Sequence, residues 1–173
     1  MRNLCRGALA VAFVMATCTF AQTAGQTKDK ALLDKDFLAK AMTAGHAEVL
    51  YSELAEKHAA NDKVKAFARQ VIKDHKDMES NLAKAAADHK LAIVAGTEKE
   101  VKDEVKRLSN LQGAAFDKAY MQRMIDDHET AIQMCESQSK LGKDAKLNDF
   151  AKGALPTMRE HLKEAKSIAS ELK

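Results

Sequence analysis

Proline, glycine, aromatic residues and cysteine are all scarce in this chain of 173 residues. It has one proline, seven glycines, three cysteines and no tryptophan, and aromatic residues make up only 5% of it. A β-sandwich or barrel would need frequent turn-forming residues and strands rich in aromatic and β-branched side chains. Hydrophobic residues, many of them alanine, still make up 46% of the chain, which favours a single all-α domain.

Several functional motifs are also missing. After residue 21 there is no phosphate-binding glycine loop, no nucleophile elbow and no Cys-x-x-Cys pair. Without Arg2 and Arg6, which lie in the first 21 residues, 28 − 2 = 26 basic residues face 25 acidic ones. A net charge near +1 gives no indication of nucleic-acid binding.

Residues 1–21 are predicted to be a secretory signal peptide. Two arginines precede an apolar run from Gly7 to Ala21, which is too short for a comfortable membrane span. Small residues at Thr19 and Ala21 predict cleavage after Ala21, which leaves residues 22–33 as a polar lead-in and 34–173 as the domain. The mature protein would then have no transmembrane segment and would be periplasmic or otherwise exported, with envelope association left open. Retention of the segment as an uncleaved anchor is the alternative.

Only Cys135 remains after such cleavage, because Cys5 and Cys18 lie in the signal. No internal disulfide can therefore form. A lone cysteine is either a buried small hydrophobic residue or a reactive or metal-ligating thiol, and we favour the buried role.

The hydrophobic pattern predicts four long helices, with the first two, 34–60 and 62–89, forming a hairpin in which Asp62 caps the second. The other two, residues 114–140 and a helix from Asp144 to about Leu172, are separated by Gly142 as a left-handed cap. Pro156 inside the last helix is expected to bend it.

The connection at residues 90–112 is too long for a simple turn. It contains a capping box, Thr97-Glu98-Lys99-Glu100, which predicts a short helix. A connection of this length can run along the bundle and place the third long helix parallel to the second, as in ferritin-like topology. A simple up-and-down bundle is the alternative.

One titratable residue lies on the apolar face of each long helix. Heptad spacing places Glu48, His75, His128 and His161 among alanine, valine, leucine and methionine. Glu48 and His75 each lie about thirteen residues from their shared turn, so they should stand at the same height. Counted in the same way from their own turn, His128 and His161 differ in height along the bundle by roughly 7 Å. A helix kink, an uneven loop or helix tilt would have to remove this difference.

One carboxylate and three imidazoles are a complete ligand set for a transition metal such as copper, zinc or iron, and the sequence leaves the metal unidentified. We therefore predict metal binding, storage or envelope stress protection rather than catalysis, and assign no catalytic residue. A metal-free envelope protein with a buried polar network and a structural or interaction role is the alternative. A di-iron oxidase is disfavoured, since that chemistry uses Glu-x-x-His pairs and this chain has Ile72, Ile125 and Met158 in place of the glutamates.

Two further groups of residues flank the histidines. An acid precedes each one and could orient an imidazole of a neighbouring helix: Asp74, Asp127 and Glu160. A methionine lies one turn from each one and could add a thioether ligand for copper, although packing is the favoured role: Met78, Met124 and Met158. Residues 66–75 also align without gaps to residues 119–128, and both segments end in Asp-His.

Four segments carry a resemblance to known proteins: Phe37–Ala41 with Glu48, Lys65–Ala68 with Asp74-His75, Phe116–Tyr120 with Asp127-His128, and Leu155–His161. Through them the chain from Phe37 to Leu172 resembles a bacterial family of secreted ferritin-like proteins, domain of unknown function 4142, often labelled outer-membrane or membrane proteins. The resemblance implies a ferritin-like four-helix bundle and export, and it supplies no established activity.

Overall fold

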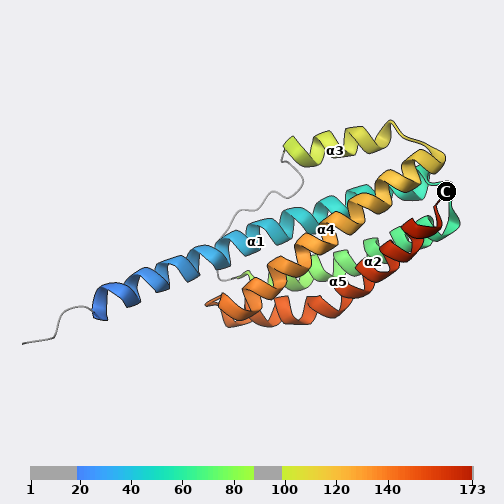
Figure 1. The fold of residues 1–173 in the computed structure, drawn as a ribbon. Coiled ribbons are helices and arrows are strands. Elements are labelled where there is room, and N and C mark those ends of the chain that lie inside the picture. The colour runs from blue at the N-terminus through green and yellow to red at the C-terminus, as the bar shows by residue number, and fades with distance from the viewer. Residues whose placement is uncertain (1–18, 88–98, 173) are drawn as a thin grey trace, which may run out of the picture.

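The fold of this protein is an all-α bundle. The computed structural model describes residues 19–87 and 99–172, with side chains from residue 33 onward, and these residues form helices and no strand (Figure 1). The helices are α1 (Thr19–His58), α2 (Asp62–Ala85), α3 (Lys99–Ser109), α4 (Gly113–Leu141) and α5 (Ala145–Glu171). The predicted four long helices and the short extra helix in the long connection are therefore confirmed.

The long connection makes α4 parallel to α2. α1 and α2 form one hairpin, α4 and α5 form a second, and α3 packs along α1 and α4 (Figure 1). The start of α4 lies beside the α1–α2 turn, because Asp117 accepts hydrogen bonds from the backbone N–H groups of Ala60 and Asn61 at 3.1 and 3.0 Å. The end of α4 lies beside the early part of α1, where Gln138 Nε2 donates to Asp34 at 2.7 Å. This is the predicted ferritin-like crossover and excludes the simple up-and-down order.

The first helix is longer than the sequence pattern predicted. α1 begins at Thr19 rather than at Asp34, so the predicted polar lead-in, residues 22–33, is helical. Residues 22–33 contain no proline and are rich in good helix formers such as alanine, glutamine, lysine and leucine, so nothing in them ends a helix. The predicted signal peptide lies outside the described residues, except for Thr19, Phe20 and Ala21.

Two other boundary details differ. Asn61, not Asp62, caps α2, because its side-chain oxygen accepts from the backbone N–H of Lys63 at 2.8 Å. Asp62 is itself the first residue of α2, where the positive end of the helix dipole stabilises a carboxylate. Thr97 and Glu98 of the predicted capping box lie outside the described residues.

Gly142 does not form the predicted left-handed cap. Its backbone is extended, with φ −61° and ψ 152°. The side chains of Gln138 and Asn148 instead occupy the space beside Gly142, so a Cβ atom there would force both of them to shift. Those two side chains hydrogen-bond to each other at 2.9 Å and hold the α4–α5 turn.

The helix bounds in the structure reduce, but do not remove, the expected height mismatch between α4 and α5. His128 lies 141 − 128 = 13 residues before the end of α4, and His161 lies 161 − 145 = 16 residues after the start of α5. Three residues of helical rise correspond to about 4.5 Å, a gap that helix tilt and two imidazole side chains can span. α5 continues as one helix through Pro156, and a bend there stays a prediction.

A polar layer divides the hydrophobic core of the bundle in two. One cluster, near the α1–α2 turn, includes Tyr51, Phe67, Phe116 and Tyr120. The other, near the α4–α5 turn, includes Phe37 together with Leu38, Leu82, Cys135, Leu147, Ala151 and Ala154. On α2, α4 and α5 the predicted site residue falls between the two clusters, and on α1 Glu48 directly follows Ala47 of the first cluster. No helix in the described part of the chain is both long enough and apolar enough to cross a membrane.

Candidate metal centre

The four predicted ligands meet in the middle of the bundle. Each of their side chains is at most 4% exposed: Glu48 on α1, His75 on α2, His128 on α4 and His161 on α5. Glu48 Oε2 lies 3.3 Å from His75 Nε2 and 3.5 Å from His128 Nε2. His128 Nε2 lies 3.1 Å from His161 Nδ1.

The three imidazoles form a compact cluster. One ring nitrogen from each lies within 4.8 Å of the others. The rings of His75 and His161 are stacked with centroids 5.6 Å apart, and the ring of His128 stands edge-on to both, at 5.6 and 5.2 Å. Such an arrangement of three nitrogen donors with a carboxylate beside them matches the donor set of zinc or copper proteins.

Hydrogen bonds outside the cluster fix the tautomers of two histidines. His128 Nδ1 lies 2.8 Å from the backbone carbonyl of Met124, and His161 Nε2 lies 3.0 Å from Asp74 Oδ2. Carbonyl and carboxylate oxygens only accept hydrogen bonds, so these two ring nitrogens carry the protons. In neutral rings, the facing atoms His128 Nε2 and His161 Nδ1 are then both lone pairs. Two lone pairs 3.1 Å apart require a cation or an extra proton between them.

Two more polar atoms of the cluster have no hydrogen bond. Glu48 Oε2 and His75 Nε2 are both buried, and neither makes a hydrogen bond despite their closeness. Leaving buried polar atoms unpaired is costly, and metal coordination is one way to remove that cost. Together with the facing nitrogens of His128 and His161, four candidate ligand atoms therefore lack a protein partner of the right kind.

Burial opposes charge on three of the four cluster residues, His75, His128 and Glu48. It lowers the pKa of His75 to about 3 and that of His128 to about 4, and the neighbouring histidines contribute in the same direction. Burial also raises the pKa of Glu48 well above its ordinary value, with the Asp127 charge adding to the effect. Neutral imidazoles are the form that binds metals, so His75 and His128 need lose no proton at neutral pH to act as ligands.

Of the three acids that precede the histidines, only Asp74 contacts an imidazole. It accepts from His161, and Gln70 Nε2 holds the same oxygen at 2.6 Å from one turn earlier. Asp127, the equivalent residue of the internal repeat, is bound instead by Arg123 at 2.6 Å.

The predicted contact of Glu160 with an imidazole is also not made, because this residue is exposed. A residue next to the inward position is turned about 100° around the helix. Neighbouring helices therefore decide whether it meets a histidine, another charge or water. The sequence did not single out Gln70. The available signal was the internal repeat, in which Gln70 aligns with Arg123 and each lies four residues before the aspartate that it contacts.

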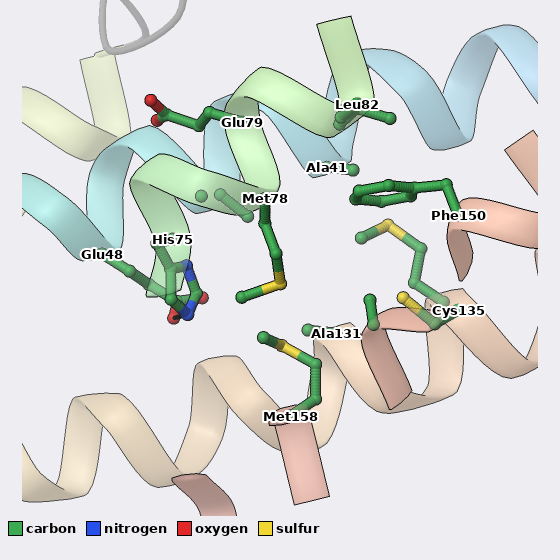
Figure 2. A pocket seen from close by; sticks show the side chains of 14 residues that line it. Ala41, Glu48, His75, Met78, Glu79, Leu82, Ala131, Cys135, Phe150 and Met158 are labelled. Carbon is green, nitrogen blue, oxygen red and sulfur yellow. Dashed lines mark ion pairs between the residues drawn. The ribbon is translucent and has the colours of Figure 1, made fainter. Parts of the chain in front are cut away.

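The methionines next to the histidines divide into two groups. Met78 and Met158 line a cavity of about 50 Å³ whose wall also includes Glu48 and His75 (Figure 2). Met124 lies instead in the hydrophobic cluster near the α1–α2 turn. Met134 also lines the cavity and was missed, because it lies outside the inward stripe of α4.

Cys135 is buried, as predicted, and lines the same cavity. Burial raises the pKa of its thiol to about 11, so the thiol is protonated at neutral pH and is a poor nucleophile and a poor metal ligand.

The remaining carboxylates do not build a di-iron centre. Glu129 pairs with Lys166 at 2.6 Å on the surface, and Glu164 is exposed. Glu79 borders the cavity but turns toward His46, 3.5 Å away. The described residues therefore place one carboxylate, Glu48, inside the histidine cluster, where the di-iron pattern asks for four.

Comparisons with known proteins agree with this architecture. The model of a family described as domain of unknown function (DUF4142) matches residues 19–168. The chain belongs to this family. Membership confirms the resemblance found in the sequence, and the family description assigns no function.

A solved structure shares the fold. It is a Streptomyces coelicolor protein described as secreted and named DUF305, with a TM-score of 0.68 and 14% sequence identity over 80% of this chain and 91% of that one. At this identity the likeness concerns the fold alone. No curated protein sequence matches the chain at a significant level.

Proposed function

We propose that this DUF4142 protein is an exported protein that binds one transition-metal ion at Glu48, His75, His128 and His161. The ion is copper, zinc or iron, and the role is metal binding, storage or protection of the envelope under stress rather than catalysis. The ligand atoms are Glu48 Oε2, His75 Nε2, His128 Nε2 and His161 Nδ1, which are the atoms of the histidine cluster that lack a suitable protein partner.

The proposal of metal binding rests mainly on the tautomers of His128 and His161. Metal-binding histidines usually donate their second N–H to a carboxylate or a backbone carbonyl, which turns the other lone pair toward the ion. Asp74 and the carbonyl of Met124 hold His161 and His128 in that way. An ion between the facing nitrogens of His128 and His161 would remove their repulsion. The same ion would give Glu48 Oε2 and His75 Nε2, which have no hydrogen bond, a partner.

Export is proposed on separate grounds. Residues 1–21 have the composition of a signal peptide, and the similar Streptomyces coelicolor structure is described as a secreted protein. We propose cleavage after Ala21, which leaves residues 22–33 before the bundle domain at 34–173. Mass spectrometry of protein recovered from the periplasm or the medium should give Gln22 as the first residue. A retained Met1 would contradict cleavage.

Metal analysis of protein purified without a histidine tag tests the site. We expect about one equivalent of a transition metal and a melting temperature that falls when a chelator removes it, because a ligand of the native state stabilises that state. The variant His128→Ala should lose the metal and the chelator effect.

The matched control is His58→Ala. His58 is bonded to the backbone of Leu111 at the end of α1, away from the cluster, so this variant should keep its metal. Wild-type protein with less than about a tenth of an equivalent and no response to chelator would contradict metal binding.

Asp74 and Asp127 provide a sharper comparison, because they occupy equivalent positions of the internal repeat. Asp74→Asn should lower metal affinity roughly 10- to 100-fold, since His161 loses the carboxylate that orients it. Asp127→Asn should change affinity far less, because Asp127 contacts Arg123 and no histidine. Competition with a chromophoric chelator measures both, and equal losses in the two variants would mean that Asp74 acts only through its general charge.

A metal-free structural or interaction role is the second candidate. One observation favours it: the Met124 carbonyl, His128, His161 and Asp74 already form a continuous hydrogen-bonded chain if one extra proton lies between the two rings. In that case the unmodified protein should carry no metal, and His128→Ala should lower its melting temperature with or without chelator.

A further inference from the structure

The cavity beside the histidine cluster has a soft, sulfur-rich wall. Met78 from α2, Met158 from α5, and Met134 and Cys135 from α4 line it. Figure 2 shows Met78 and Met158 extending toward one another next to the side chains of Glu48 and His75. The cavity volume of about 50 Å³ is several times what a single water molecule needs.

Two polar atoms at one end of this cavity have no hydrogen-bond partner. Glu48 and His75 both line it, and their atoms Oε2 and Nε2 are the buried atoms without hydrogen bonds. A cavity lined only by methionine, alanine and leucine would be an ordinary packing defect. Here unpaired oxygen and nitrogen atoms lie at one side and thioethers at the other, and the combination of imidazole nitrogen with thioether sulfur favours copper.

We propose that the ion bound at this site is a soft monovalent one, Cu(I), and that the thioethers of Met78 and Met158 join the histidine cluster in holding it. This inference rests on the proposed function, because it names the metal of the same site. Thioether sulfur binds Cu(I) well, whereas zinc is held by thiolate, imidazole and carboxylate and gains little from methionine.

The test compares methionines that differ in one respect. Met78→Leu/Met158→Leu removes both sulfur atoms next to the cluster, and Leu fills nearly the same volume, so the fold should be retained. Met124→Leu is the matched control: Met124 also lies one turn from an inward histidine, but its side chain packs in the cluster near the α1–α2 turn. Its backbone carbonyl, which holds His128, is unaffected by the substitution.

Affinities for Cu(I) are measured by bicinchoninate competition under anaerobic, reducing conditions, and affinities for Zn(II) by a chromophoric chelator. Cu(I) affinity should fall at least about tenfold in Met78→Leu/Met158→Leu, with Zn(II) affinity nearly unchanged and with Met124→Leu like wild type. The two single variants allow the same comparison if the double variant is misfolded by circular dichroism. X-ray absorption at the copper edge should show sulfur neighbours in wild type and none in the double variant.

Failure of the Cu(I) assignment can be distinguished from failure of the proposed metal site. Unchanged Cu(I) affinity in the double variant, or an equal loss in Met124→Leu, overturns the assignment to Cu(I) and its methionines. If the wild type still binds one Zn(II) through the histidines, the proposed metal site itself stands. Wild-type protein that binds neither ion overturns both.

Discussion

Metal-free Glu48→Gln protein should lose about 4 kcal/mol of unfolding free energy when the pH falls from 7 to 5. The loss comes from His75 and His128, whose pKa values in the folded protein are about 3 and about 4, well below their ordinary value of 6.5. A lowered pKa contributes stability that is fully present above pH 6.5 and is lost as the pH falls toward the folded value. At pH 5 each histidine is protonated when unfolded and neutral when folded, which costs about 2 kcal/mol each.

The glutamine background isolates this effect from a second titration with the opposite sign. The pKa of Glu48 is raised, so Glu48 contributes stability at low pH that is lost as the pH rises through its folded pKa. Wild-type protein should therefore lose less stability on acidification than the variant does. Urea denaturation with chelator present, at pH 5, 6 and 7, measures both proteins. Equal unfolding free energies at pH 5 and pH 7 in Glu48→Gln would show that His75 and His128 are not buried in neutral form.

Replacement of Asp34 by alanine should destabilise the protein by about 3 to 5 kcal/mol. The Asp34 side chain accepts hydrogen bonds from the backbone N–H groups of Lys143 and Asp144, at 3.0 Å each, and from Gln138 Nε2. It is a buried acceptor that joins α1 to the α4–α5 turn. Its removal takes the acceptor away from both backbone N–H groups, while Gln138 Nε2 keeps its hydrogen bond to Asn148. Each unsatisfied buried donor costs about 1–3 kcal/mol.

Asp36→Ala is the matched control for this prediction. Asp36 lies two residues away on α1, is exposed, and forms an i,i+4 pair with Lys40, so its loss should cost less than about 0.5 kcal/mol. Asp34→Asn keeps one accepting oxygen and should fall between the two. Urea denaturation at pH 7 gives all three values. A free-energy loss in Asp34→Ala as small as that of Asp36→Ala would show that the α4–α5 turn does not depend on this carboxylate.

The site residues could be predicted because they interrupt a regular pattern. His128, for example, follows Met121 and Met124 in a stripe that is otherwise apolar, and the buried side chains of α4 match that stripe. An ionisable group in such a position must face the core if the helix packs at all. The sequence therefore placed all four candidate ligands inside the bundle, and the crossover connection was long enough to predict the order of the helices.

Residues that hold the site and the turns could not be predicted in the same way. Asp34 and Asp117 each cap a turn of the other hairpin, more than 50 positions away in the sequence. Nothing in their local pattern separates them from exposed aspartates such as Asp36. Gly142 was expected to be needed for its backbone angles, and the structure shows instead that nearby side chains occupy the space of a Cβ atom.

The sequence by itself determined which residues point into the bundle, because 3.6 residues per turn is a local property of each helix. Only the tertiary structure decided which groups are contacted by the residues next to each inward-facing stripe. Asp74 and Asp127 have the same local sequence position, yet one orients His161 and the other binds Arg123. Likewise Met78 and Met158 border the cavity while Met124 does not. These differences depend on how each helix is rotated against its neighbours, which is set by the packing of the whole bundle and not by any single helix.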